Sequence, residues 1–266
     1  MQPQPPVIHR PTLQLRLWWI TALLIGINIG LYLWQISTGV NSATPSLKDA
    51  IAWGADYAPI TFLYAPERLF TSMFFHFGFI HLAMNMWALY LFGQIAEQLY
   101  GKVYFVGLYI IAGLGGSLFS SWFSFHDSMI FLTQGQDISR LPHVSAGASG
   151  AVMGLGAGLT VLSLLPPLTK HTLILNAKPL LLIMFINLMI GILTPNINNW
   201  AHLGGMMIGV ILSLIYYLFE RKNQPRQASI IGISVGVLIC AIAYLYCTSL
   251  LPSVTPLWMT LIQDMN

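Results

Sequence analysis

The chain has 266 residues, of which 56% are hydrophobic and only 7% are charged. A soluble domain carries about 25% charged residues, so this chain cannot cover itself with a polar surface and belongs in a lipid bilayer. The net charge of +3 is too small to argue for nucleic acid as a partner. Cys240 and Cys247 would lie roughly 10 Å apart along one helix, too far for a disulfide.

Seven apolar segments are long enough to cross a membrane, because a helical span needs about 20 residues. The fourth and fifth are the shortest. The first lacks a small-residue cleavage site, so we expect a retained helix and no cleavable signal peptide. The segments cover residues 17–37, 76–97, 103–124, 147–166, 178–195, 200–219 and 228–250.

The fold class predicted from these segments is an all-α polytopic membrane protein in three parts. Residues 1–16 form a cytoplasmic tail, residues 17–220 a six-helix core, and residues 221–266 a basic linker, a seventh helix and a short outer tail. Eight basic residues would share the side of the N-terminus and three the other side, so the positive-inside rule puts the N-terminus in the cytoplasm. The eight are Arg10, Arg16, Lys102, Lys170, Lys178, Arg221, Lys222 and Arg226, and the three are Lys48, Arg68 and Arg140.

Two long loops are expected on the outer side. The first, residues 38–75, mixes aromatic side chains with scattered charge and is predicted to be partly embedded at the interface, where Trp and Tyr prefer to lie. The second, residues 125–146, carries His126 and Asp127 and leads directly into Gly147. It is either a mobile cap over the entrance to Ser149 or a plain connector.

The stretch Gly147-Ala148-Ser149-Gly150 opens the fourth apolar segment. A serine at a helix start has a backbone N–H without a helical partner and lies at the positive end of the helix dipole, and both stabilise a developing oxyanion. Gly150, Gly154 and Gly158 then form a stripe that lets another helix approach closely. Ser149 is interpreted either as a nucleophile or as one more small packing residue.

His202 begins the sixth apolar segment, and Gly205 and Gly209 place a second small-residue stripe on the same face. Two glycine-striped helices are natural neighbours. A near-neutral imidazole can accept a serine proton, so we predict that His202 is the base for Ser149. The alternative is a structural histidine bonded to a backbone carbonyl.

His81 and Asn85 share a helix face at a spacing of four residues, and both can donate hydrogen bonds to a negative oxygen. We interpret them as oxyanion-stabilising groups, with His76 as a positioning or loop-anchoring residue. The rival interpretation is a metal site with three imidazole ligands. No His-Glu-x-x-His run and no neighbouring acid or cysteine supports it, so no metal and no cofactor are expected.

A full catalytic triad is not predicted. None of the eight acidic residues lies within residues 149–165 or 200–219. Asp127 or Asp137 could fold in, but nothing in the sequence requires it. The expected chemistry is a Ser–His dyad without a carboxylate to orient the histidine.

Taken together, these motifs resemble the rhomboid family of intramembrane serine proteases over roughly residues 45–220. Three separated motifs in the family's order, each on an apolar segment, make the resemblance specific. The matching stretches are Arg68-Leu-Phe-Thr-Ser-Met-Phe-Phe-His76, His81-Leu-Ala-Met-Asn85, Glu97 with Gly101, Gly147-Ala-Ser149-Gly150, and Ala201-His202-Leu-Gly-Gly205 with Gly209.

The resemblance implies a six-helix bundle with a short central fourth helix and a serine in a water-filled cavity below the outer membrane surface. Ser149 would be the nucleophile and His202 the general base and acid. The Ser149 N–H and the side chains of His81 and Asn85 would hold the oxyanion. The supporting residues would be His76, Gly147, Gly150, Arg68, Glu97 and Gly205. The seventh helix is similar to that of the "six plus one" members.

Two positions depart from the family pattern. Met153 stands one turn after the serine, where the family often has an aromatic residue that packs on the catalytic histidine. A methionine there makes a softer, more adaptable contact. Glu67-Arg68 replaces the Trp-Arg that is frequent in the first outer loop.

The sequence therefore predicts a serine endopeptidase of the bacterial plasma membrane that cleaves transmembrane-helix protein substrates near the outer face. Unpaired backbone groups are costly in lipid, so substrate segments with helix-destabilising residues should be favoured. One alternative is a non-catalytic rhomboid-like protein that captures transmembrane helices. A transporter or channel is the other, weakened by the lack of internal repeats.

Overall fold

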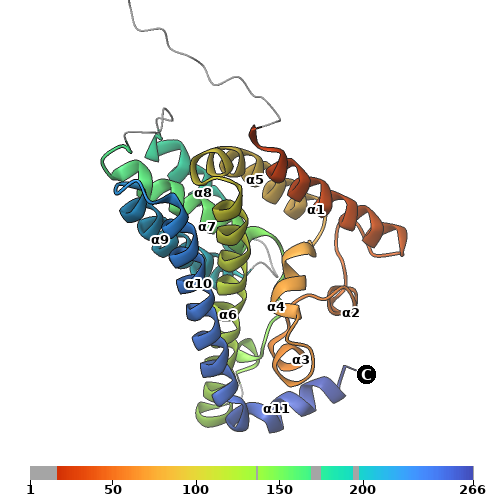
Figure 1. Ribbon diagram of the computed structural model, residues 1–266. Helices are drawn as coiled ribbons and strands as arrows, with labels where there is room; N and C mark the ends of the chain where they lie inside the picture. Colours follow the sequence, from red (N-terminus) through yellow and green to blue (C-terminus); the bar gives the residue numbers. More distant parts are fainter. Residues whose placement is uncertain (1–16, 136, 169–174, 194–197, 266) are drawn as a thin grey trace, which may run out of the picture.

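The computed structural model describes residues 17–135, 137–168, 175–193 and 198–265 (Figure 1). The predicted cytoplasmic tail, with Arg10 and Arg16, lies outside the described residues, as does Lys170. The described part is almost entirely helical.

All seven predicted spans are helices. Five of them are long and apolar enough to cross a membrane, whereas α7 and α8, with 16 and 17 residues, are shorter. The prediction that the fourth and fifth spans are the shortest is therefore confirmed. The seven helices are α1 Trp19–Ser37, α5 Phe79–Tyr100, α6 Lys102–Gln134, α7 Ser149–Leu164, α8 Ala177–Leu193, α9 Asn199–Glu220 and α10 Pro225–Ser249.

Helix α7 lies at the centre of the bundle. It packs against α5, α6, α8 and α9, and most of its side chains are buried. Helix α1 packs on α5 at one side, and α10 packs against α6 and α9 at another (Figure 1). A helix that is apolar on every face belongs in a core or a membrane, and the short α7 buries most of its side chains against its four neighbours.

The two predicted glycine stripes face each other, as expected. A β-carbon on Gly205 would collide with the carbonyl oxygen of Gly150, and one on Gly209 with that of Gly154. The backbones of α7 and α9 therefore touch directly, the close approach that small residues permit in membranes. Helix α6 joins this contact, because a β-carbon on Gly116 would lie 2.6 Å from the Ala201 carbonyl oxygen.

The first outer loop contains four short helices and its own small core. These are α2 Leu47–Ala52, α3 Ala58–Leu63, α4 Arg68–Thr71 and the 3₁₀ helix η2 Ser72–Phe74. Ala55, Tyr57 and Phe75 are buried together with Val144 of the second outer loop. The two outer loops are thus packed against each other.

The second outer loop is shorter than the predicted range of residues 125–146, because its first part is helical. Helix α6 continues to Gln134, so His126 and Asp127 lie on its last turns. The remaining connector contains the short 3₁₀ helix η3 Ile138–Arg140, and Arg140 forms an ion pair with Asp127 at 2.7 Å. Polar side chains near residue 125 suggested a loop, but a helix continues into water when its backbone bonds are satisfied internally.

The C-terminal segment is a helix, α11 Leu251–Gln263, where the sequence analysis expected only a short tail. Val254 and Trp258, four residues apart on one face, are fully buried. Trp258 packs on Phe125 with ring centroids 4.4 Å apart, and its indole N–H donates to Ser128 Oγ at 2.9 Å. An amphipathic stripe thus docks α11 under α3 and the end of α6 (Figure 1).

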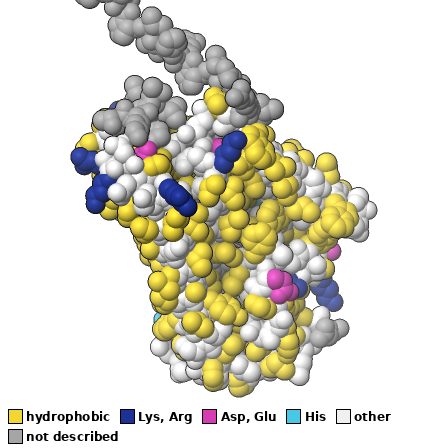
Figure 2. Space-filling view, viewed as in Figure 1, with side chains coloured by type: hydrophobic (Ala, Val, Ile, Leu, Met, Phe, Trp, Pro, Cys, Tyr) yellow, Lys and Arg dark blue, Asp and Glu magenta, His cyan; other side chains and the backbone are white. Residues whose placement is uncertain are grey.

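Apolar side chains cover a broad belt of the surface, and basic side chains gather near its upper end (Figure 2). The described basic residues of that end flank helix termini: Lys102 starts α6, Lys178 lies in the first turn of α8, and Arg221 ends α9. The chain is an integral membrane protein, and basic side chains are more frequent at one end of its helix bundle than at the other.

Candidate active site

Ser149 is the first residue of α7 and is 8% exposed. The two residues before Ser149 are in contact with groups from other parts of the chain. The Gly147 N–H donates to the Ser72 carbonyl at 2.8 Å, and the Ala148 N–H lies 3.5 Å from His76 Nε2. The N–H groups of the first helical turn have no carbonyl one turn back to bond. Ser149 therefore presents both a hydroxyl and a backbone donor at a helix start.

Gly147 keeps a space open between Ser149 and His81. Its φ of 120° is a conformation that residues with a side chain rarely adopt. A β-carbon on Gly147 would lie 2.9 Å from His81 Nε2 and 3.8 Å from Ser149 Oγ. The glycine is thus required both by its backbone and by the two polar atoms that flank it.

His202 lies in the first turn of α9 and is 2% exposed. Its Nδ1 is 3.0 Å from Oδ1 of Asn199. An amide oxygen only accepts hydrogen bonds, so Nδ1 carries the proton in the neutral ring and Nε2 bears the lone pair. Within the described residues, His202 Nε2 is buried and has no hydrogen-bond partner. It is a free acceptor.

His81 has the opposite tautomer. Its Nδ1 accepts from the Phe77 N–H at 3.1 Å, so in the neutral ring Nε2 carries the hydrogen. That Nε2 is buried without a partner among the described residues, beside the space over Gly147. His81 is therefore a free donor.

Asn85 lies one turn after His81, and its side-chain amide donates to the His81 carbonyl at 3.0 Å. One amide hydrogen remains for another acceptor. His76 stacks edge-on against His81, with ring centroids 5.2 Å apart, and is fully buried. His76, His81 and Asn85 thus form one cluster between α5 and the start of α7.

Helices α7 and α9 touch one position after Ser149 and one position before His202. Gly150 faces the Ala201 carbonyl, and a small polar cavity of about 10 Å³, room for about one water molecule, lies there. A larger hollow of about 470 Å³ lies beside it, and Asn198 lines both. The small cavity is lined by Ser72, Gly113, Ser117, Ser145, Ala146, Gly147, Ser149, Gly150, Asn198 and Ala201.

Arg68 and Glu97 lie apart from this cluster. Arg68 Nη1 donates to the carbonyls of Ile51 and Ala55, at 2.7 and 3.0 Å, and so holds the first outer loop. Glu97 accepts from the N–H groups of Ile20 and Thr21 at the start of α1. A carboxylate at a helix N-terminus satisfies free N–H groups and complements the dipole, so Glu97 caps α1. It lies about 18 Å along α5 from Asn85.

Met153 is 1% exposed and packs in the main hydrophobic core. In the part of the chain that the structure describes, no group of three or more His, Cys, Asp or Glu side chains could hold a metal ion.

Asn199, which fixes the His202 ring, was missed by the sequence analysis, although its position three residues before His202 was the available signal.

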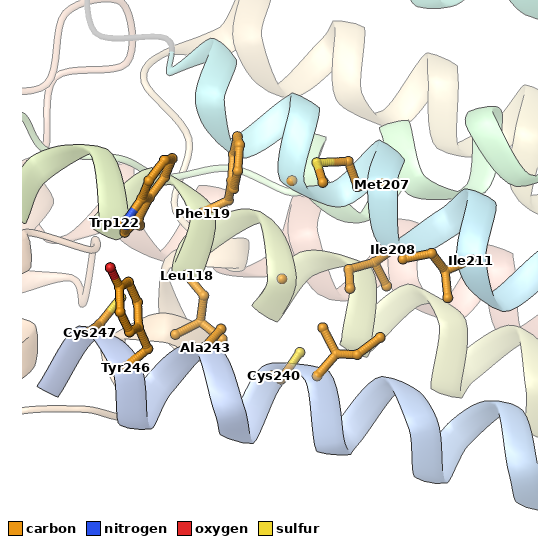
Figure 3. A pocket seen from close by; sticks show the side chains of 13 residues that line it. Leu118, Phe119, Trp122, Met207, Ile208, Ile211, Cys240, Ala243, Tyr246 and Cys247 are labelled. Atoms are coloured by element: carbon orange, nitrogen blue, oxygen red, sulfur yellow. The ribbon is translucent and has the colours of Figure 1, made fainter. Parts of the chain in front are cut away.

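An apolar groove of about 340 Å³ runs between α6, α9 and α10 (Figure 3), and Ser149 is not among the residues that line it. Phe119 and Trp122 line it from α6, Met207 and Ile211 from α9, and Cys240 from α10. This lining suits hydrocarbon and offers little for hydrolytic chemistry.

A rhomboid-domain family model matches residues 65–219, more than half of the chain. Rhomboid protease AarA of Providencia stuartii is 29% identical over 85% of this chain and 82% of its own length. RHOMBOID-like protein 1 of Arabidopsis thaliana is 38% identical over 60% of this chain. Rhomboid protease GluP of Bacillus subtilis is 33% identical over 75%.

The chain spans 38% and 36% of the length of these last two relatives. The matched region runs from the first outer loop to the end of α9. It contains all the residues discussed as candidates for catalysis, namely His76, His81, Asn85, Ser149 and His202. Motif order, an all-helical membrane bundle and the family match agree, and the chain belongs to the rhomboid family.

Proposed function

We propose that this protein is an intramembrane serine endopeptidase that uses Ser149 as nucleophile and His202 as general base. Family membership and the similarity to proteins named rhomboid proteases support a protease. The observation that carries the residue assignment is the Asn199 bond to His202 Nδ1, which leaves Nε2 free to accept a proton.

The proposed reaction uses each of these groups in turn. His202 Nε2 takes the proton of Ser149 Oγ as the oxygen attacks the scissile carbonyl carbon. The oxyanion accepts hydrogen bonds from the Ser149 N–H, His81 Nε2–H and the Asn85 amide. His202 then protonates the leaving amine, and a water molecule, deprotonated by His202, hydrolyses the acyl-enzyme and restores Ser149.

The substrates proposed are membrane proteins cleaved in or near a transmembrane helix. A helical segment hides its carbonyl groups in its own hydrogen bonds, so the segment must unwind to reach Ser149. Backbone groups freed in lipid are costly, and polar surroundings such as Ser117, Ser145 and Asn198 reduce that cost. Substrates rich in Gly or Pro at the cleavage site should therefore be cut faster.

We further propose that the site opens to the outer face of a bacterial plasma membrane. Lys102, Arg221 and Arg226 flank the helix ends opposite to the start of α7, and positive residues favour the cytoplasmic side. This orientation puts Ser149 and both long connectors outside.

The test is to replace Ser149 by Ala and His202 by Ala in the full chain reconstituted in proteoliposomes. Two readouts are needed: cleavage of a co-reconstituted single-span protein, and covalent labelling by a fluorophosphonate. Ser149→Ala should abolish both, because the nucleophile is gone. His202→Ala should lower both by about 10⁴-fold or more, since the dyad acts as a unit.

Ser163→Ala is the matched control, because Ser163 lies on the same helix and bonds only the Thr160 carbonyl at 2.6 Å. It should keep full activity. Normal cleavage by Ser149→Ala would refute the proposal. A protein that binds single-span helices but never reacts with the phosphonate would be the non-catalytic alternative.

A further inference from the structure

Asp56 is an acidic residue buried in the first outer loop, 2% exposed, between α2 and α3. Its Oδ1 accepts from Thr61 Oγ1 of α3 at 2.6 Å. Its Oδ2 accepts from Ser121 Oγ of α6 at 3.2 Å. One carboxylate therefore joins the loop to the long central helix, with each oxygen holding one hydroxyl.

The backbone of Asp56 is paired with the second outer loop. Its N–H donates to the Ser145 carbonyl at 2.9 Å, and its carbonyl accepts from the Ser145 N–H at 2.7 Å, an isolated antiparallel bridge. Ser145 lines the same small cavity as Ser149 and begins the short segment that leads to it. Further along that segment, the Gly147 N–H is held by the Ser72 carbonyl. The approach to Ser149 is thus fixed at two points by the first outer loop.

Burial disfavours the charged form of the Asp56 carboxyl, so its charge does not by itself explain why an acid stands here. Burial raises the pKa of the Asp56 carboxyl to about 6, although the Thr61 and Ser121 hydroxyls and the Arg68 charge act to lower it. Arg68 directs its Nη1 to two backbone carbonyls of the same loop. A buried carboxylate held by two hydroxyls costs solvation, so an apolar residue would serve packing alone better.

We propose that Asp56 is a positioning residue: its buried carboxylate locks the loop backbone that pairs with Ser145 and so fixes the segment that delivers Ser149 to His202 and His81. The inference rests on the proposed function of Ser149. Displacing a nucleophile by about 1 Å can cost about 10²-fold in rate, so a lock of this kind affects chemistry more than substrate binding.

The test compares Asp56→Ala with Asp56→Asn in the full chain in proteoliposomes. Asp56→Ala removes both acceptors and should lower kcat and the rate of fluorophosphonate labelling of Ser149 about tenfold or more, with KM little changed. Asp56→Asn keeps an acceptor for Thr61 and can donate to Ser121 Oγ, so it should restore most of both rates. A merely structural residue would change the melting temperature without this split between kcat and KM.

Asp49→Asn is the matched control, since Asp49 is an exposed carboxylate of the same loop that bonds only Ser46. It should leave the labelling rate unchanged. If Asp56→Ala does not fold, Thr61→Val and Ser121→Ala each remove one donor and should each slow labelling several-fold.

The inference is overturned if the Asp56→Ala protein, or both hydroxyl variants, label Ser149 at the wild-type rate. Equal impairment of Asp56→Ala and Asp56→Asn would also overturn it, because charge and not hydrogen-bond geometry would then matter. A wild-type chain in which Ser149 never reacts would instead refute the proposed function, so the two failures are distinguishable.

Discussion

The hydrogen bond from His202 to Asn199 decides which imidazole nitrogen can accept a proton. In the proposed serine–histidine site, which has no carboxylate, ring orientation must come from another acceptor, and an amide oxygen supplies it without adding a buried charge. His81 receives its opposite tautomer from a backbone N–H. His81 and His202 are thus held in opposite tautomers, each by a single neighbour.

Asn199→Ala should therefore lower kcat about 10- to 100-fold, because losing one buried hydrogen bond costs about 1–3 kcal/mol and lets the ring rotate or change tautomer. KM should change little. Asn199→Asp, which keeps an acceptor at the same place, should recover most of the rate. Cleavage kinetics in proteoliposomes measure this, and an unchanged kcat in the alanine variant would show that the ring is oriented otherwise.

At this scale the sequence singled out Ser149, His202 and His81 as candidates, but it did not show how these side chains are held. Ser149 and His202 attract attention because polar groups are rare in apolar segments. Asn199 does not, because an asparagine at a helix start is ordinarily read as a capping residue. Asp56 lies in a loop where acidic residues are common, and only tertiary packing reveals its burial.

The helices α7 and α9 meet through their backbones. The glycine spacings predicted this contact, because each stripe follows the helical repeat. The spacings of Gly150 and Gly205 could not show that α6 would join through Gly116, since that contact depends on how three helices cross. The length of α6 was also misjudged, because hydropathy reports where lipid ends and not where a helix ends.

Gly205→Ala should destabilise the protein by about 1–3 kcal/mol, because the new methyl group would overlap the Gly150 carbonyl and force the helices apart. Activity should fall with it, since Ser149 and His202 are carried by these two helices. Gly30→Ala on α1 is the control, as nothing lies within 4 Å of its β-position. Thermal unfolding in detergent would measure both, and equal melting temperatures would contradict the contact.

As a whole molecule, the chain adds two C-terminal helices to the region shared with the family. Seven spans and their order were predicted from apolar length alone. The division into tail, core and extension stays a prediction, and α11 was missed because its apolar residues are too few to span and its amphipathic period is interrupted by Pro256. Helix α11 nevertheless buries Trp258 against the C-terminal part of α6, in the same cluster as Phe62 of α3.

Trp258→Ala should lower the unfolding free energy by up to about 3–5 kcal/mol, as expected for a fully buried aromatic side chain. Fluorophosphonate labelling of Ser149 should slow as well, because α3 carries Thr61, the partner of Asp56. Trp87→Ala, at a side chain that is 44% exposed, should change neither. A Trp258→Ala protein as stable and as reactive as wild type would mean that α11 is dispensable.

The backbone contact of α6, α7 and α9 lies immediately after Ser149, where Gly116, Gly150 and Ala201 meet without intervening side chains. A file of water molecules needs a polar channel wider than such a contact leaves. In the proposed mechanism, the water that hydrolysis requires therefore enters from the end at which α7 begins. The proposed enzyme, built in this way, can keep a wet reaction centre inside a membrane without dissipating the proton gradient that the membrane maintains.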